Sequence, residues 1–362
     1  MSKVPHLVVA LSSHGFGHLA QVAPVLNTLR QCLPMLRLTI QTSLSQAILR
    51  KRITGDFTHI PEATDIGMIM ANALEVRVKE SLAAYRSWHS HWERHMAQQK
   101  ALLTSLAPDL LLANIPYLPL SAAASLSLPA VALCSLHWAA ILQGYCSTQP
   151  DWQALQDTLM HAYNSAAVFL RPAPSMPMPD LNNTHSIDPI AALGRNQRDQ
   201  LNARLGLPTD GILILVALGG VAMPLPMKHW PVMPGIYWLV PAAWGIRRAD
   251  ILHQESVPDI PFTDLLRSCD VVLSKPGYGT FVEAACNGRP VLYVERNDWP
   301  EEPWLVRWLQ KHDNALAVTR EQLETGAILD TLHILLEQPR KPPPLPSGIE
   351  EAVSYLRPYL TV

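Results

Sequence analysis

Several kinds of pattern are missing from this sequence of 362 residues, and each absence excludes a class of protein. The five cysteines form no Cys-x-x-Cys pair, which argues against a disulfide-stabilised secreted domain and fits a reducing compartment. The 28 lysines and arginines nearly balance the 30 acidic residues, so the composition predicts no nucleic-acid partner. The first apolar run begins at Leu7, which leaves too little room for a signal peptide. We therefore expect a cytoplasmic protein.

Motifs of several enzyme classes are also missing. There is no Gly-x-Ser-x-Gly elbow of a serine hydrolase, no Walker A lysine motif and no His-Glu-x-x-His metal motif. The most apolar stretch, residues 110–142, is long enough for a membrane helix. However, Pro116, Pro119 and Pro129 divide it into shorter pieces. We expect no transmembrane segment, while peripheral membrane contact remains open.

What the sequence does contain is an alternation of short apolar runs with longer segments of helical period, which predicts parallel strands joined by crossover helices. The expected strands are 7–11, 36–41, 109–113, 130–134, 166–170, 212–218, 236–240, 271–274 and 291–295. The expected helices include 82–106, 197–205, 262–268, 281–287 and 301–311. Each half of the chain is predicted to form one open, doubly wound sheet, so the fold class is α/β.

The pattern lapses once in the middle, in the polar and proline-rich stretch 171–195. We therefore predict an N-terminal domain over residues 1–195 and a C-terminal domain over residues 196–345. A proline-rich spacer at 339–344 then leads to a last amphipathic helix at 349–356. The segment 346–362 is expected to pack back onto the first domain.

The first strand ends in a glycine-rich turn that contains His14, Gly15, Gly17 and His18 and leads into a helix. Such a turn lets a ligand approach the backbone at the edge of the sheet where α/β proteins bind ligands. The third glycine of a dinucleotide fingerprint is missing, so binding of NAD is disfavoured. An imidazole at position 18 could accept a proton near neutral pH, although a histidine here could instead only cap the helix.

A second glycine pair, Gly219 and Gly220, follows the strand at 212–218 and is compatible with a phosphate or with a plain tight turn. The segment after the strand at 271–274 is more informative. It brings together the following residues: Ser274, Lys275, Gly277, Tyr278, Gly279, Thr280 and Glu283. Helix amides, the Thr280 hydroxyl and the Lys275 charge suit a diphosphate, and Glu283 one turn later suits vicinal ribose hydroxyls.

Two acidic residues, Glu301 and Glu302, open the helix after the strand at 291–295, with Trp299 and Trp304 on either side. Acidic side chains often only complement a helix dipole, but sugar sites also place carboxylates beside aromatic rings. His91 and His95 are spaced to share a metal, yet no third ligand is near them in the sequence, and we expect a solvated helix face. No metal site is predicted.

The order of these motifs resembles that of the glycosyltransferase-B superfamily over nearly the whole chain. The phrases His-Gly-Phe-Gly-His and Ser-Lys-Pro-Gly-Tyr-Gly-Thr are most similar to the glycosyltransferase-like domain of plant arabinokinases and its bacterial relatives. A more distant resemblance is to the N-acetylglucosaminyltransferase of peptidoglycan synthesis and to plant-type glucosyltransferases. The resemblance implies two Rossmann-like domains that face each other across a cleft.

The resemblance also implies roles for single residues. His18 takes the place of the catalytic base, while Gly219 and Gly220 lie beneath the diphosphate. Glu301 and Glu302 match positions that hold the donor sugar. Related sequences are expected to carry an acidic residue after the strand at 109–113, where it orients the base, and this chain has Asn114 instead.

We therefore expect an inverting glycosyltransferase of the hexosyl or N-acetylhexosaminyl class that uses a nucleoside-diphosphate sugar, of UDP type, and an acceptor not identified by the sequence. Inversion is favoured because retaining members carry two glutamates eight positions apart, and Lys275 stands eight positions before Glu283. No obligatory metal or other cofactor is expected. A nucleotide-sugar hydrolase or epimerase, or a binding module without turnover, remains an alternative.

Overall fold

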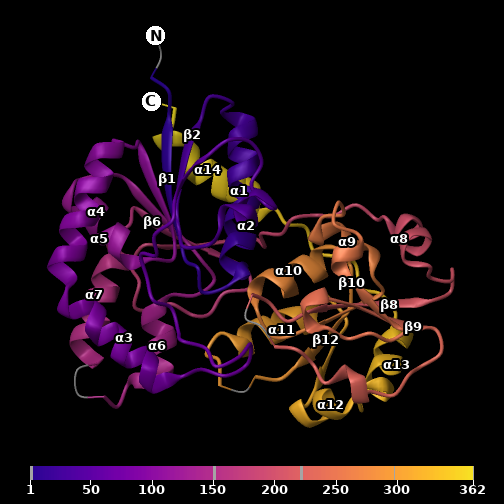
Figure 1. The fold of residues 1–362 in the computed structure, drawn as a ribbon. Helices are drawn as coiled ribbons and strands as arrows, with labels where there is room; N and C mark the ends of the chain where they lie inside the picture. Colours follow the sequence, from indigo (N-terminus) through magenta and orange to yellow (C-terminus); the bar gives the residue numbers. More distant parts are fainter. Residues whose placement is uncertain (1–2, 150–151, 221–222, 297, 362) are drawn as a thin grey trace.

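The computed structural model describes residues 3–149, 152–220, 223–296 and 298–361. The chain forms two lobes, and both of its ends lie in the same lobe (Figure 1). Within the described ranges, no helix combines the length and the apolar character needed to cross a membrane.

The N-terminal lobe is built on a seven-stranded parallel sheet with the order β3-β2-β1-β4-β5-β6-β7. Its strands are β1 (His6–Leu11), β2 (Arg37–Gln41), β3 (Thr58–Ile60), β4 (Leu110–Asn114), β5 (Ala130–Leu133), β6 (Val168–Pro172) and β7 (Thr184–Ile187). Leu7 and Val9 of β1 pack on one face of the sheet, and Val8 and Ala10 pack on the other. The winding reverses between β1 and β4, so the carboxyl ends of these two strands form the switch point at which such sheets bind ligands.

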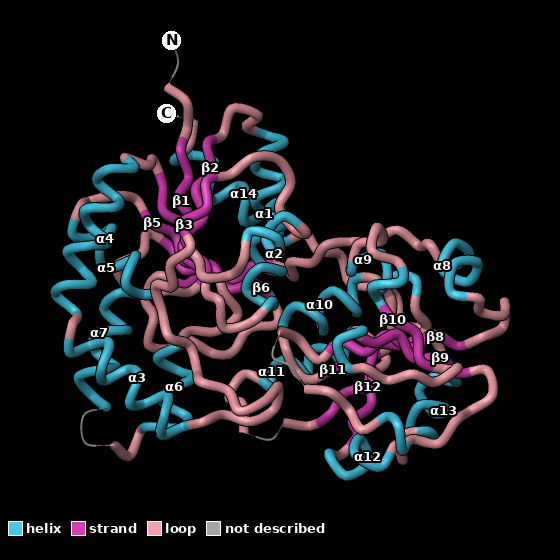
Figure 2. Tube along the Cα trace, in the orientation of Figure 1, coloured by secondary structure: helices cyan, strands magenta, loops and turns pink. Residues whose placement is uncertain are grey.

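Helices cover both faces of this sheet (Figure 2). They are α1 (Phe16–Cys32), α2 (Gln46–Arg50), α3 (Val78–Ser90), α4 (Trp92–Leu106), α5 (Tyr117–Ser125), α6 (Trp138–Cys146) and α7 (Trp152–Asn164). The single helix predicted for 82–106 is wrong, because the chain leaves helical geometry at His91 and α3 and α4 are separate. The Ser90 hydroxyl donates to the Ser87 carbonyl at 2.8 Å, which is the kind of local bond that competes with a continuing helix.

The C-terminal lobe contains a six-stranded parallel sheet with the order β10-β9-β8-β11-β12-β13. Its strands are β8 (Ile212–Ala217), β9 (Ile236–Val240), β10 (Ile251–His253), β11 (Val271–Ser274), β12 (Val291–Val294) and β13 (Ala315–Val318). The helices of this lobe are α8 (Arg198–Leu205), α9 (Phe262–Ser268), α10 (Tyr278–Cys286), α11 (Glu302–His312), α12 (Arg320–Thr325) and α13 (Leu329–Glu337). Here the winding reverses between β8 and β11. Two doubly wound α/β lobes are therefore present, as predicted.

The chain crosses between the lobes twice. Ile190 belongs to the core around β1, whereas the next residue, Ala191, belongs to the core of the C-terminal sheet. The first crossing therefore lies a few residues before the expected boundary at residue 195. After the second crossing, α14 (Gly348–Leu356) packs Ala352 and Leu356 into the core that contains α1 and β1.

Four strands were not predicted from the sequence: β3, β7, β10 and β13. These are the two edge strands of each sheet. The strands predicted from apolar runs are all interior, with ends within about two residues of those observed.

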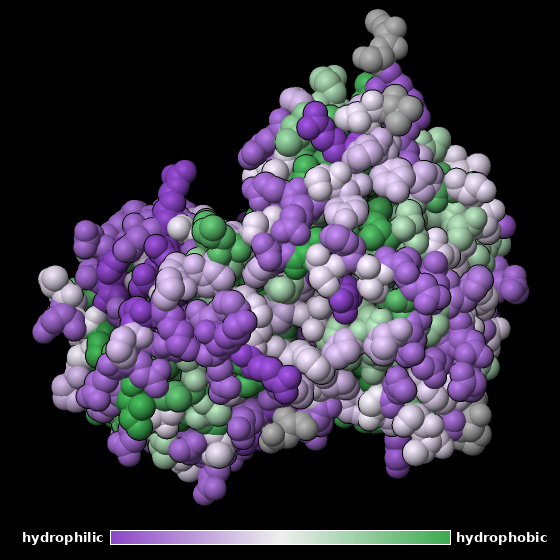
Figure 3. Space-filling model, turned by 180° about the vertical axis from the view of Figure 1, so that it is seen from behind, coloured by the Kyte–Doolittle hydropathy of each residue, from purple (hydrophilic) through white to green (hydrophobic). Residues whose placement is uncertain are grey.

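The space-filling view shows the outline and the hydropathy of one face of the molecule. Seen from behind, the lobes are divided by a notch, and hydrophobic side chains form small patches among hydrophilic ones (Figure 3). This side of the molecule therefore offers no broad apolar face to a membrane.

Candidate functional site

The predicted site residues follow the strands at the two switch points. His14 and His18 come after β1, and Asn114 ends β4. In the other lobe, Gly219 comes after β8, and Lys275 directly follows β11. Contacts between the lobes bring these four strand ends to one interface, so residues far apart in the sequence form one site.

His18 lies in the first turn of α1 and is buried. Its Nδ1 is 2.7 Å from the Oδ1 atom of Asn114. Because an amide oxygen only accepts, neutral His18 must carry its proton on Nδ1, which leaves a lone pair on Nε2. Burial lowers the pKa of His18 to about 4, although the bond to Asn114 acts in the opposite direction. The ring is therefore neutral at pH 7 and can accept a proton.

Asn114 is itself fixed by a series of hydrogen bonds. Its amide nitrogen donates to Gln21 Oε1 at 3.0 Å, and the Gln21 amide nitrogen donates to the Ser135 hydroxyl at 2.9 Å. The Ser135 hydroxyl donates to Oε1 of Glu301, in the other lobe, at 2.6 Å. We call His18, Asn114, Gln21, Ser135 and Glu301 the relay.

An aromatic wall stands beside the relay. The His14 ring stacks on Trp299 with centroids 5.7 Å apart, and Trp138 meets His14 edge-on at 5.0 Å. The Arg296 guanidinium lies 4.1 Å from the centroid of the Trp299 ring. Burial, together with the nearby His18, lowers the pKa of His14 to about 3. His14 is therefore neutral, and its buried Nε2 has no hydrogen-bond partner among the described residues.

A buried acid, Asp65, lies behind this wall. Its Oδ2 accepts from the Trp138 ring nitrogen at 2.7 Å, and its carboxylate also accepts from Ser12. Burial raises the pKa of Asp65 to about 6. The loop after β3 thereby supplies an acidic group close to the strand end that holds both histidines.

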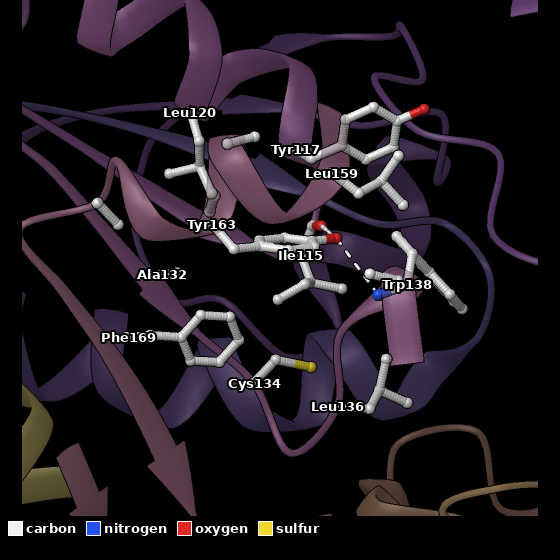
Figure 4. Packing of buried hydrophobic residues seen from close by; sticks show 14 of the residues in the cluster. Ile115, Tyr117, Leu120, Ala132, Cys134, Leu136, Trp138, Leu159, Tyr163 and Phe169 are labelled. Carbon is white, nitrogen blue, oxygen red and sulfur yellow. Dashed lines mark hydrogen bonds between the residues drawn. The ribbon is translucent and has the colours of Figure 1, made fainter. Parts of the chain in front are cut away.

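The packing behind the site is shown in Figure 4. The Tyr163 hydroxyl accepts from the backbone nitrogen of Trp138 at 3.3 Å and donates to the carbonyl of Ile115 at 3.1 Å. Since Ile115 directly follows Asn114, this one buried side chain joins the loop that carries Asn114 to the start of α6. The position of the Trp138 ring is thus tied to that of the relay.

The C-terminal side of the site is centred on Lys275. A Cβ atom added at Gly219 would lie 3.9 Å from the Lys275 ammonium nitrogen, and one added at Gly277 would lie 3.7 Å from it. Gly219 also has a φ of +90°, which favours glycine. Burial and the nearby Arg296 lower the pKa of Lys275 to about 8. The ion pairs found among the described residues do not include Lys275, although the nearby carboxylates of Glu301 and Glu302 raise its pKa.

The start of α10 lies next to Lys275. Its N-cap residue, Gly277, contributes no side-chain bond, so no capping side chain occupies the first amides of the helix. Thr280, in this first turn, is partly exposed. Lys275 and Thr280 therefore lie on either side of the N-cap of α10, and their assignment to a diphosphate stays a prediction.

Glycines hold the two lobes in close contact at this point. A Cβ atom at Gly279 would lie 3.0 Å from the Ala20 Cβ and 3.2 Å from the Gly17 Cα. The Phe16 ring likewise lies on Gly220. A Cβ at Gly15 would meet nothing within 4 Å. The starts of α1 and α10 thus pack backbone against backbone, which only small residues permit.

Two residues of the predicted binding segment are used in internal contacts. The Ser274 hydroxyl donates to the carbonyl of Ala217 at 2.8 Å. The Tyr278 hydroxyl accepts from the backbone nitrogen of Ile190 at 3.0 Å and donates to the carbonyl of Ala173 at 3.1 Å. Tyr278 therefore ties α10 to the first crossing between the lobes, a role that the sequence did not indicate.

Glu283, the expected ribose ligand, is buried and paired with Arg52 of the other lobe. Both guanidinium nitrogens bond to the carboxylate, with 3.0 Å between Nη2 and Oε2. The structure thus gives Glu283 a partner at the lobe interface, and a ribose hydroxyl would share or replace that partner.

Glu301 and Glu302 lie together but bond differently. Glu301 accepts from Ser135 through Oε1 and from the Trp299 ring nitrogen, at 3.2 Å, through Oε2. Glu302 Oε1 accepts from the backbone nitrogen of Arg296 at 3.0 Å. Trp299 is buried at the site, whereas Trp304 lies at the surface with Arg307 over its ring. The expected pair of flanking tryptophans is therefore reduced to Trp299.

The histidines of α3 and α4 lie apart from this site. His89 is 2.8 Å from the Tyr117 hydroxyl, and His95 stacks on Trp88. His91 and His95 help line a surface pocket of about 460 Å³. No group of residues suited to hold a metal occurs in the described ranges.

Five residues of the site were missed by sequence reasoning: Gln21, Arg52, Asp65, Ser135 and Arg296. Ser135 and Arg296 each lie two residues beyond the end of a strand. That position was a usable signal. Gln21, Arg52 and Asp65 are set by tertiary packing and carry no such signal.

Comparison with known proteins identifies both a sequence relative and structural neighbours. No protein-family model matches the chain. The L-arabinokinase of Arabidopsis thaliana is 23% identical over 331 residues, which cover 89% of this chain and 31% of that protein. The chain therefore spans about a third of the length of that relative.

Solved structures match nearly the whole chain. A glycosyltransferase of kitacinnamycin superposes with a TM-score of 0.64 at 14% identity, covering 99% of this chain and 95% of that one. The spinosyn rhamnosyltransferase complexed with thymidine diphosphate has a TM-score of 0.57 at 16% identity, with coverage of 99% and 96%. A Listeria monocytogenes protein assigned as a UDP-N-acetylglucosamine 2-epimerase has a TM-score of 0.58 at 13% identity, with coverage of 99% and 96%. The predicted fold of two facing Rossmann-like domains is confirmed.

Proposed function

We propose that this chain, which has the glycosyltransferase-B fold, is an inverting glycosyltransferase that uses a nucleoside-diphosphate sugar. One observation carries the proposal: Lys275 and the start of α10 lie across the lobe interface from a neutral, oriented histidine. The glycosyltransferases among the structural neighbours and the L-arabinokinase relative are consistent with this proposal.

The proposed reaction is a single displacement. Nε2 of His18 takes the proton of an acceptor hydroxyl, whose oxygen forms a bond to the anomeric carbon of the donor sugar. The bond from that carbon to the diphosphate breaks, and the diphosphate leaves with its negative charge. Lys275 and the α10 amides stabilise this charge, so we propose that no metal ion is obligatory. Attack opposite the leaving group inverts the anomeric configuration.

Donor recognition follows the same layout. Glu283 would accept from the ribose hydroxyls, which is consistent with a UDP-type donor, while Glu301 and Glu302 would accept from the sugar. Glu301 can do this within the relay, because each carboxylate oxygen has two lone pairs. We propose a hexosyl or N-acetylhexosaminyl donor and an acceptor bound by the N-terminal lobe.

A second candidate is a nucleotide-sugar hydrolase or epimerase, in which His18 would activate water or move a proton of the sugar. The likeness to the Listeria monocytogenes protein favours this alternative. A binding module without turnover is a third candidate, because Asn114 occupies the position where an acidic partner was expected.

The test is to incubate the full chain with a panel of nucleoside-diphosphate sugars, with and without sugar and lipid acceptors, and to measure free diphosphate. Release that depends on an acceptor supports transfer. Release by water alone, or interconversion of the sugar without an acceptor, supports the second candidate. Saturable binding without any reaction supports the module. The variant His18→Gln should bind the donor and lose the reaction.

A further inference from the structure

The relay extends from one lobe to the other, and its direction is fixed at the Glu301 end. Both carboxylate oxygens of Glu301 accept: the Trp299 ring nitrogen, which can only donate, bonds to Oε2 at 3.2 Å, and the Ser135 hydroxyl gives its one proton to Oε1. The distance of 2.6 Å is typical of a hydroxyl bonded to a charged oxygen. Ser135 can then only accept from Gln21, which makes the Gln21 amide present its nitrogen to Ser135 and its oxygen to Asn114.

The same logic continues to the histidine. Since Gln21 presents its oxygen, Asn114 must donate to it through the amide nitrogen and must turn its own oxygen toward His18. The orientation of each amide is therefore determined by its neighbour, starting from the carboxylate. His18 receives an acceptor at Nδ1 and keeps its lone pair on Nε2.

We propose that Glu301 is a positioning residue for His18. Through Ser135, Gln21 and Asn114 it fixes the tautomer of His18 that leaves Nε2 free to act as a base, and it does so while the two lobes are in contact. This inference rests on the proposed function, because it assigns the base of that reaction. It also gives Asn114 an acidic partner, since Glu301 lies three residues beyond Asn114 along the relay. Since Ser135 belongs to the N-terminal lobe and Glu301 to the C-terminal lobe, the bond between them requires contact between the two lobes.

Different groups surround Glu301 and His18, the two ends of the relay. Burial raises the pKa of Glu301, whereas the hydrogen bonds from Ser135 and Trp299 and the positive charges of Lys275 and Arg296 act in the opposite direction. The groups that face His18 are the neutral His14 and the buried thiol of Cys134, whose sulfur is 3.8 Å from Nδ1. Lys275 belongs to the proposed diphosphate site and acts on Glu301, and Glu301 in turn orients His18. Glu301 therefore links the donor site to the proposed base.

The experiment is to measure the protonation of the two His18 ring nitrogens by NMR in the full-length protein labelled with ¹⁵N-histidine, without any substrate. The His18 signals are assigned with His18→Gln. The wild type should show a single tautomer with the proton on Nδ1. Glu301→Gln and Ser135→Ala should each lose this single tautomer, giving a mixture or the Nε2-protonated form. Circular dichroism confirms that each variant is folded, and the two variants test the same relay independently.

The matched control is Glu302→Gln, which removes the same charge from the neighbouring residue outside the relay. It should keep the wild-type tautomer of His18. The inference is overturned if Glu301→Gln and Ser135→Ala both keep the Nδ1-protonated form, or if Glu302→Gln changes the tautomer equally. Because no substrate is present, failure of this test is distinguishable from failure of the transfer assay.

Discussion

Arg52, which follows α2 in the N-terminal lobe, pairs through two nitrogens with the carboxylate of Glu283 in α10 of the C-terminal lobe. Glu283 is only 1% exposed. Burying a carboxylate away from water is unfavourable unless the carboxylate is paired. The ion pair with Arg52 therefore stabilises the buried carboxylate of Glu283. A ribose that binds to Glu283 must therefore compete with Arg52 or share the carboxylate with it.

We predict that Arg52→Met raises the affinity for UDP. Methionine keeps an apolar stem near Phe262, over which the guanidinium lies, but it leaves the carboxylate free to accept from the ribose. Since hydrogen bonds to a charged group contribute about 1.5–3 kcal/mol, the dissociation constant should fall about tenfold or more. Isothermal titration calorimetry measures the change, with Arg50→Met as the matched control because exposed Arg50 lies over Phe57. A lower affinity would instead make Arg52 a ligand of the donor.

Lys275 gives UDP binding a predicted pH dependence. The pKa of Lys275 is lowered to about 8, so the free site is fully charged well below pH 8 and loses its charge as the pH rises through about 8. Affinity should therefore fall between pH 7 and 9.5, a range in which the terminal phosphate of UDP is already ionised. Lys275→Arg should remove this pH dependence because arginine stays charged, and Lys275→Met should weaken binding at every pH. An unchanged affinity in Lys275→Met would exclude Lys275 from the diphosphate site.

Replacement of the amide beside His18 should change the titration of that histidine. In Asn114→Asp a carboxylate directly faces Nδ1 and stabilises the imidazolium, so the pKa of His18 should rise above its value of about 4. The protonated fraction then increases at any given acidic pH, and the acid limb of the rate profile should move to higher pH. NMR titration of His18 and the pH dependence of kcat/KM check both parts. Asn114→Ala is the control and should not raise the pKa of His18.

The interior of the fold could be predicted from the sequence because buried parallel strands are continuous apolar runs. β1, β4, β8 and β11 are buried along their whole length except at the first residue of β8, and each was found. The edge strands β3, β7, β10 and β13 were missed since they are short and partly exposed. An edge strand has a neighbour on one side only, so its sequence carries less of the hydrophobic signal.

The candidate site was predictable in the same partial way. Lys275 follows a strand end and was selected from its local pattern, whereas Asn114, at another strand end, was selected through the family resemblance. Gln21 instead lies inside α1, one turn after His18, where a buried polar side chain looks like any other helical residue. Its role depends on Ser135, from a distant part of the same lobe, and on Glu301, which reaches Ser135 from the other lobe. Bonds between lobes leave no local trace in a sequence.

The buried carboxylate of Asp65 is predicted to make the stability of the protein depend on pH. Burial raises the pKa of Asp65 to about 6 from an ordinary value of 3.8, so between these values the folded state binds more protons than the unfolded state. The contribution of Asp65 to stability therefore falls as the pH rises through this range. Well above pH 6 the ionised Asp65 lowers the free energy of unfolding by its full amount, about 3 kcal/mol if each pKa unit corresponds to 1.36 kcal/mol.

Asp65→Asn removes this charge and keeps an oxygen that can accept from the Trp138 ring nitrogen. The variant should be more stable than the wild type at pH 7.5, by about 2–3 kcal/mol, and the gain should shrink toward pH 4. Urea unfolding followed by tryptophan fluorescence at both pH values measures the difference. The histidines titrate in both proteins, so the comparison isolates Asp65.

A variant that is less stable at pH 7.5 would show that the ionised carboxylate is needed for folding. A variant that is more stable but less active would place Asp65 among the groups that serve the reaction, since its charge would then be kept at a cost in stability.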